Sequence, residues 1–76
     1  MSVIIIPFGR FTDFMDNPTV LQEVSDTDAL KEKLLCQHPE LKDATFLLAV
    51  NRQVIKENKI LHENDEVAIM PPFSGG

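Results

Sequence analysis

Glycine and cysteine are both scarce in this chain of 76 residues. Only three glycines are present, and two of them, Gly75 and Gly76, are the last two residues. If three glycines were placed at random, both positions would be filled in roughly one sequence in a thousand. Cys36 is the only cysteine, which excludes an intrachain disulfide and a zinc site built from several cysteines. Because small secreted domains usually depend on disulfides, we expect a cytoplasmic protein.

Positive charge and long hydrophobic runs are also lacking. The chain has 7 basic and 12 acidic residues, a net charge of −5 and an isoelectric point of about 4.7. Proteins that bind nucleic acids carry basic patches, so we expect no nucleic-acid partner. The apolar run at residues 3–6 lacks the flanks of a signal peptide, and neither it nor the run at residues 46–50 approaches the ~20 residues of a membrane-spanning helix. We therefore expect no membrane partner.

The remaining composition is that of a small globular domain. Hydrophobic residues make up 43% of the chain and charged residues 25%, which is typical of folded proteins. A domain of this size buries only about 60–65% of the surface of its unfolded chain, which leaves little stability for a deep internal cavity. The chemistry is therefore expected at the surface or at an end of the chain.

Five segments have the composition of β-strands. The first is nearly all apolar and ends in Pro-Phe-Gly, which indicates a strand covered on at least one face. The last alternates polar and apolar residues, so Val67 and Ile69 are expected to point inward and their neighbours outward. The predicted strands are residues 2–8, 19–24, 45–51, 53–55 and 65–70, with the first two in antiparallel pairing.

A helix is predicted between the second and third strands. Ser25 or Asp26 can cap its first N–H groups, and Pro39 disfavours helical backbone at His38. Its apolar face is formed by Leu30, Leu34 and Leu41.

Two further groups of apolar residues are expected to pack on the core. Phe8, Phe11 and Phe14 recur every three residues, a spacing typical of a 3₁₀ turn with one aromatic side. Ile60 and Leu61 interrupt a polar segment and are predicted to anchor that loop.

The order of these elements is β-β-α-β-β-β, which predicts a two-layer α+β domain. A mixed sheet of four to five strands packed on one main helix is the ubiquitin-like β-grasp arrangement. Residues 1–70 would form this domain, and residues 71–76 would form an extended C-terminal tail.

The tail carries the groups that could take part in a reaction. Pro71 and Pro72 end the strand, and six extended residues reach roughly 20 Å. Gly75 and Gly76 have no Cβ, so a partner could close tightly around their backbone. A terminal carboxylate becomes reactive once it is converted to an acyl-adenylate. The alternative is a frayed end without a function.

Residues 64–76 (NDEVAIMPPFSGG) resemble the C-terminus of the small subunit of molybdopterin synthase, the MoaD family within the ubiquitin-like MoaD/ThiS sulfur-carrier superfamily. Residues 49–51, just before a brief strand, are also similar to that family. Residues 6–10 are instead closer to other sulfur carriers of the superfamily.

The resemblance implies a sulfur carrier that is not catalytic alone and is the sulfur-donating subunit of a sulfurtransferase. An adenylating enzyme of the ubiquitin-activating type would use ATP to activate Gly76, and a sulfur donor would convert it to a thiocarboxylate. The large subunit of molybdopterin synthase, in a heterotetramer, would pass this sulfur to cyclic pyranopterin monophosphate in molybdenum cofactor biosynthesis. No bound cofactor and no metal are implied.

The same resemblance assigns roles along the tail. Gly76 would bear the sulfur, and Gly75, which has no Cβ, would leave room for a partner to close around the backbone. The residues that would bind the partner are Met70, Pro71, Pro72, Phe73, Ser74 and Gly75. Met70 and Ala68 would join Phe73 in an exposed apolar patch.

Other functions remain open at this point. They are a sulfur carrier for thiamine or cysteine biosynthesis, a ubiquitin-like protein modifier that is attached to lysines, and an interaction module with an inert tail. Among the remaining residues, Cys36 is expected to be a small, partly buried hydrophobic residue, and His38 and His62 to be solvated. Glu63, Asp65 and Glu66 form an acidic stretch, either a solvated face or a patch that meets basic groups on a partner.

Overall fold

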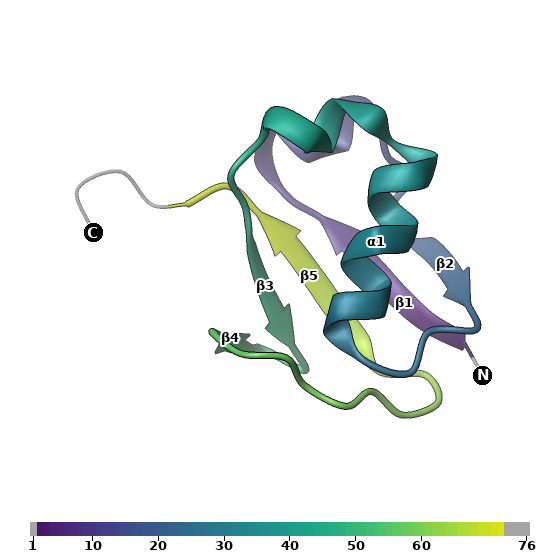
Figure 1. Ribbon diagram of the computed structural model, residues 1–76. Helices are drawn as coiled ribbons and strands as arrows, with labels where there is room; N and C mark the ends of the chain where they lie inside the picture. The colour runs from purple at the N-terminus through teal and green to yellow at the C-terminus, as the bar shows by residue number, and fades with distance from the viewer. Residues whose placement is uncertain (1, 73–76) are drawn as a thin grey trace.

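The computed structural model describes residues 2–72, which form one mixed sheet with an α-helix across it (Figure 1). The strands are β1 (Ser2–Pro7), β2 (Thr19–Gln22), β3 (Leu47–Val50), β4 (Gln53–Ile55) and β5 (Glu66–Met70). The helix is α1 (Thr27–Gln37), and two 3₁₀ turns are η1 (Gly9–Asp13) and η2 (Pro39–Asp43). The element order and the two-layer α+β architecture confirm the prediction.

The five strands lie in the order β2-β1-β5-β3-β4. β1 and β5 are parallel, and the other neighbours are antiparallel, so the sheet is mixed as predicted. β5, the last strand in the sequence, is the central strand of the sheet. β5 ends at Met70. The division of the chain into a domain of residues 1–70 and a tail of residues 71–76 stays a prediction, because residues 73–76 lie outside the described part.

The helix begins and ends where the sequence predicts. The Asp26 carboxylate accepts a hydrogen bond from the backbone N–H of Ala29 (2.8 Å), which satisfies one of the free donors of the first turn. The helix ends at Gln37, before the His38-Pro39 pair. Leu30 and Leu34 are fully buried, and Leu41 reaches the same core from η2.

The core lies between α1 and the inner face of the sheet. It is built from alternate residues of the central strands, the helix leucines and Phe11, whose ring lies edge-on to Phe14 and Phe46 at 6.1 and 6.2 Å. The prediction for Phe8 is wrong, since 49% of this residue is exposed. Its backbone is still extended (φ −128°, ψ 159°), so the alternation of β1 continues through it and points its side chain away from the core.

The loop between β4 and β5 is fastened to the first turn of α1. Thr27 is fully buried, and its hydroxyl accepts a hydrogen bond from the Lys59 backbone N–H (2.9 Å) and donates to Asn58 Oδ1 (3.1 Å). Leu61 is buried as predicted, but Ile60 is 68% exposed, contrary to the prediction. Ile60 forms a β-bridge with Asp26, and neighbouring residues of extended backbone point to opposite sides.

We predict that Thr27→Val destabilises the fold by about 1–3 kcal/mol, because valine has nearly the same shape but leaves the Lys59 N–H without its acceptor. Urea unfolding at neutral pH measures the change. Thr45→Val, at an exposed position, is the matched control and is expected to change stability by less than about 0.5 kcal/mol. Equal effects of the two substitutions would show that the Thr27 hydroxyl does not hold the loop.

Candidate functional site

Residues 71 and 72 leave the sheet at the end of β5, between the end of β1 and the start of β3. Pro7 is the register partner of Ile69, and Leu47 is the partner of Met70. Pro71 is half-buried and Pro72 is exposed. The base of the predicted tail is therefore held by strands on both sides.

Four of the predicted site residues, Phe73, Ser74, Gly75 and Gly76, lie outside the described residues, so their roles stay predictions. Met70, Pro71 and Pro72 are described and lie together at the end of the sheet.

Gly9, which the sequence reasoning passed over, also lies at this place. It follows β1, has a φ of +59°, and faces Pro71 so closely that a Cβ would lie 2.9 Å from Pro71 Cγ. The signal that could have found it was the scarcity of glycine itself, since Gly9 is the third of only three glycines.

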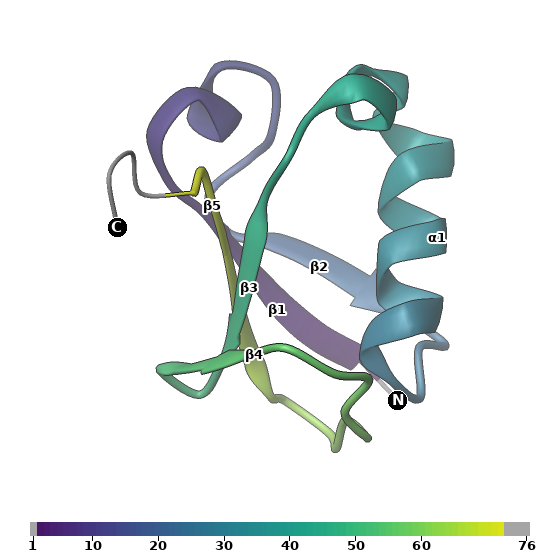
Figure 2. The same ribbon diagram turned by 60° about the vertical axis from the view of Figure 1, so that its left-hand side comes forward.

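The sheet has a second face, on the side away from α1, which we call the outer face (Figure 2). The register places Ile6, Ala68, Ala49 and Val54 in one row across four strands, because directly paired residues share a face. The outer face comprises Ser2, Ile4, Ile6, Val20, Gln22, Leu47, Ala49, Val54, Glu66, Ala68 and Met70.

All of these residues except Ser2, Gln22 and Glu66 are apolar. Val20 and Val54 are more than half exposed, and Ala68 and Met70 are half-buried. The prediction that Ala68 and Met70 point outward is confirmed, whereas Ile4 and Ile6 were missed. Their signal was present, because residues 3–6 are apolar at both inward and outward positions. Contiguous apolar surface of this kind is typical of a protein-binding site.

Two carboxylates of the acidic stretch before β5 accept hydrogen bonds from neighbouring segments. Asp65 accepts hydrogen bonds from the His62 backbone N–H (2.8 Å) and from Asn51 Nδ2 (3.1 Å), and Glu63 accepts from Ser2 N and Oγ (3.0 and 3.1 Å). These hydrogen bonds lie at the surface, so they add local structural contacts to the predicted solvated face. The stretch also lies at the start of β5, at the end opposite Pro71, so it is not beside the base of the tail.

The hydrogen bonds to Asp65 also set its acidity. The His62 N–H donor, and after it the Asn51 amide, hold the pKa of the Asp65 carboxyl below its ordinary value because both stabilise the charged form.

Two of the remaining predictions need correction. Cys36 is exposed, because it lies two residues after Leu34 and so about 200° around the helix from that buried side chain. His38 is half-buried, with its ring centroid 5.6 Å from that of Phe14. His62 is exposed as predicted.

Within residues 2–72, no group of three or more His, Cys, Asp or Glu side chains is placed to hold a metal ion. No helix in this part of the chain has the length and hydrophobicity to cross a bilayer.

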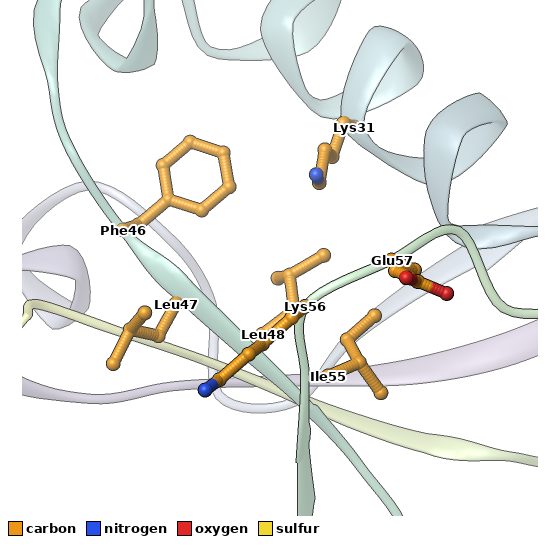
Figure 3. A pocket seen from close by; sticks show the side chains of 7 residues that line it. All are labelled: Lys31, Phe46, Leu47, Leu48, Ile55, Lys56 and Glu57. Carbon is orange, nitrogen blue, oxygen red and sulfur yellow. The ribbon is translucent and has the colours of Figure 1, made fainter.

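A cavity of about 300 Å³ opens on the helix side of the sheet (Figure 3). Phe46, Leu48 and Ile55 supply its apolar lining, and Lys31 of α1 faces them across the opening. Its other lining residues are Leu47, Lys56 and Glu57. Its ionisable side chains are those of Lys31, Lys56 and Glu57, and no histidine, cysteine or hydroxyl side chain lines it.

Comparison with known proteins agrees with the resemblance seen in the sequence. A model of the ThiS family matches residues 6–76. The molybdopterin synthase sulfur carrier subunit of Arabidopsis thaliana is 26% identical over 81 residues, covering 100% of this chain and 84% of that protein. The corresponding subunit of Chlamydomonas reinhardtii is 33% identical over 60 residues, covering 74% of this chain and 72% of that protein.

Two solved structures share the fold over 100% of both chains. One is from the protein–protein complex of subunits 1 and 2 of molybdopterin-converting factor of Helicobacter pylori 26695, with a TM-score of 0.74 and 24% identity. The other is SAMP1 from Haloferax volcanii, with a TM-score of 0.80 and 18% identity. These likenesses confirm the ubiquitin-like β-grasp fold.

We predict that Asp65→Asn reduces the loss of stability in acid. The folded-state pKa of Asp65 is lowered, so its contribution is present above the unfolded-state pKa and is lost as the pH falls through the folded-state value, below about pH 4. Melting temperatures measured between pH 6 and pH 2 should fall less steeply in Asp65→Asn than in the wild type. Asp43→Asn, at an exposed carboxylate, is the control, and equal slopes in all three proteins would contradict the assignment.

Proposed function

The chain belongs to the ThiS family, and we propose that it is the sulfur carrier subunit of a molybdopterin synthase, with Gly76 as the group that bears the sulfur. The carrier would hold sulfur as a thiocarboxylate and donate it to cyclic pyranopterin monophosphate in molybdenum cofactor biosynthesis. Its need for ATP-dependent activation suits the cytoplasm.

The proposed chemistry has two steps before sulfur leaves the carrier. The Gly76 carboxylate attacks the α-phosphorus of ATP, a C–O–P linkage forms, and pyrophosphate leaves. A persulfide on the donor protein then attacks the carbonyl carbon of this acyl-adenylate, and AMP leaves with the electron pair of the C–O bond. A thiol reductant cleaves the S–S bond of the resulting acyl disulfide, which yields the thiocarboxylate and leaves the thiol in a disulfide with the donor. The partner enzyme binds the ATP, so this chain requires no cofactor of its own.

The observation that carries the proposal is the placement of the chain's last described residues. β5 is the central strand and is paired on both sides, and Pro71 and Pro72 follow directly after its last residue, Met70. A fixed base followed by a short segment ending in two small residues suits insertion into a narrow channel of a partner. The match of the family to residues 6–76 includes this segment.

The outer face supports a protein partner. We assign it to the large subunit of molybdopterin synthase, with two copies of each subunit in a heterotetramer. Met70 and Leu47 place the apolar surface immediately beside the base of the tail, so one partner can cover the surface and receive the tail together. The adenylating enzyme would bind in turn, before the large subunit.

A second candidate has the same chemistry and a different acceptor. Residues 6–10 resemble those of other sulfur carriers, which favours thiamine or cysteine biosynthesis as the alternative destination. Attachment to lysines as a ubiquitin-like modifier would use the same adenylate. The alternatives differ in the group that is transferred: a sulfur carrier passes sulfur to its acceptor, whereas a modifier passes the acyl group of Gly76 to a lysine.

We predict that the chain gains about 16 Da at Gly76 when it is incubated with its adenylating enzyme, ATP and a sulfur source, since sulfur replaces one oxygen. Intact-mass spectrometry with fragmentation locates the change. Deletion of Gly76 should abolish the gain and leave the melting temperature unchanged. An unmodified mass with every cognate adenylating enzyme would contradict the carrier role. Transfer of sulfur to cyclic pyranopterin monophosphate with the large subunit separates the main proposal from the second candidate, and lysine adducts would indicate a modifier.

We further predict that Ala68→Glu weakens binding of the large subunit about tenfold or more, because it places a charge in the middle of the outer face where it would be desolvated. Isothermal titration calorimetry measures the affinity. Ile60→Glu is the matched control: Ile60 is 68% exposed but lies in the loop beside the first turn of α1, away from the outer face. If both substitutions weaken binding equally, the outer face is not the interface.

A further inference from the structure

Gly9 has a backbone position that is fixed from both sides. The residue before it, Phe8, donates its backbone N–H to the Ile69 carbonyl of β5 (2.9 Å). The carbonyl of Gly9 itself accepts a hydrogen bond from Thr12 Oγ1 (2.8 Å), within a turn whose Phe11 is fully buried. Gly9 is thus attached to β5 on one side and to the core on the other.

Pro71 packs against this fixed backbone. A Cβ at position 9 would lie 2.9 Å from Pro71 Cγ and 3.1 Å from Pro71 Cδ, closer than carbon atoms can approach without displacement. These atoms belong to a ring closed onto the backbone nitrogen, so they cannot rotate away as the end of a flexible side chain can. A side chain at position 9 must therefore displace either the Pro71 ring or the backbone of residue 9 itself.

The left-handed backbone at Gly9 does not by itself explain the glycine. Among residues 2–72, four others have positive φ values, and none of them is a glycine. They are Glu23, Asn51, Arg52 and Asn64, at 63°, 49°, 73° and 65°. This chain accepts the cost of left-handed backbone at ordinary residues. What distinguishes position 9 is the contact with Pro71.

The opposite side of the tail base is also fixed, because Met70 is paired with Leu47 of β3. The chain after Met70 must therefore pass between β3 and Gly9. Five extended residues after Pro71 span at most about 17 Å, so a small rotation at Pro71 becomes a displacement of several ångströms at the end of such a segment.

We propose that Gly9 is a positioning residue whose missing side chain lets Pro71 lie against it and so sets the direction in which the chain leaves the sheet. The proposal rests on the proposed function, because the enzyme that adenylates Gly76 must receive the chain along this direction. A misplacement of about 1 Å at a reacting group can cost about 100-fold in rate.

The test is a double-mutant cycle of the wild type, Gly9→Asn, Pro71→Ala and the double variant. Asparagine tolerates left-handed backbone but carries a Cβ, so it retains the φ value and introduces the clash. We expect Gly9→Asn to slow thiocarboxylate formation by about tenfold or more with Pro71 present. In the Pro71→Ala background it should slow the reaction by less than about threefold, since the ring atoms have been removed.

Thermal unfolding of the same four proteins, with rates measured well below every melting temperature, separates positioning from loss of fold. Asn64→Ala is the matched control, because it changes a left-handed residue at the other end of β5, and we expect it to lower stability without changing the rate. An equal slowing by Gly9→Asn in the wild-type and Pro71→Ala backgrounds, or no slowing in either, would overturn the proposal.

If the proposed function is wrong, the result is different: the wild type itself gains no mass in the thiocarboxylate assay. In that case NMR of the free protein decides the positioning role. Nuclear Overhauser contacts between the Gly9 Hα protons and the Pro71 ring are expected, together with changed amide shifts of residues 73–76 in Gly9→Asn. Absence of the contacts, or unchanged shifts, would refute it.

Discussion

β5 is hydrogen-bonded on both sides, in parallel register to β1 and in antiparallel register to β3, and its Val67 and Ile69 are fully buried. A strand held in this way cannot leave the sheet unless the core opens, so Met70 is a fixed point from which the chain continues. The same pairing brings the end of β1 to the end of β5 and thereby places Gly9 against Pro71. The base of the tail is therefore a consequence of how the core is closed.

The two faces of the sheet have different roles, one in stability and the other in association. The inner face packs on α1 and supplies most of the hydrophobic stabilisation, whereas the outer face is apolar without contributing to that core. An apolar face on so small a protein favours association, and the net charge of −5 opposes uncontrolled self-association. The carboxylates of Asp65 and Glu63 accept hydrogen bonds from Asn51 and Ser2, which hold the segment before β5 in place.

The periodic elements could be predicted because their signals are local. Asp26 and Pro39 mark the ends of the helix, and the alternation around Val67 marks β5. Pairing between β1 and β5 joins residues about sixty positions apart and has no local signal, so the neighbours of Pro71 could not be foreseen. The predictions for Phe8 and Cys36 are wrong for another reason. The 3₁₀ turn begins at Gly9, so Phe8 still has the extended backbone of β1, and Cys36 is close to Leu34 in sequence but not on the same side of the helix. The chemistry proposed for the tail depended on resemblance, and its residues 73–76 lie outside the described part of the chain.

The distribution of glycine follows one physical rule across the chain. Left-handed backbone at Glu23, Asn51, Arg52 and Asn64 is tolerated without glycine, because nothing there approaches closely enough to forbid a Cβ. Glycine occurs at position 9, where a proline ring lies within 3 Å of the place that a Cβ would take. Under the proposed function, Gly75 and Gly76 lack a Cβ for the same reason, because the walls of a partner's channel would lie close to their backbone. The three glycines would then all mark places where the backbone must be approached closely, one at the base of the tail and two at its end.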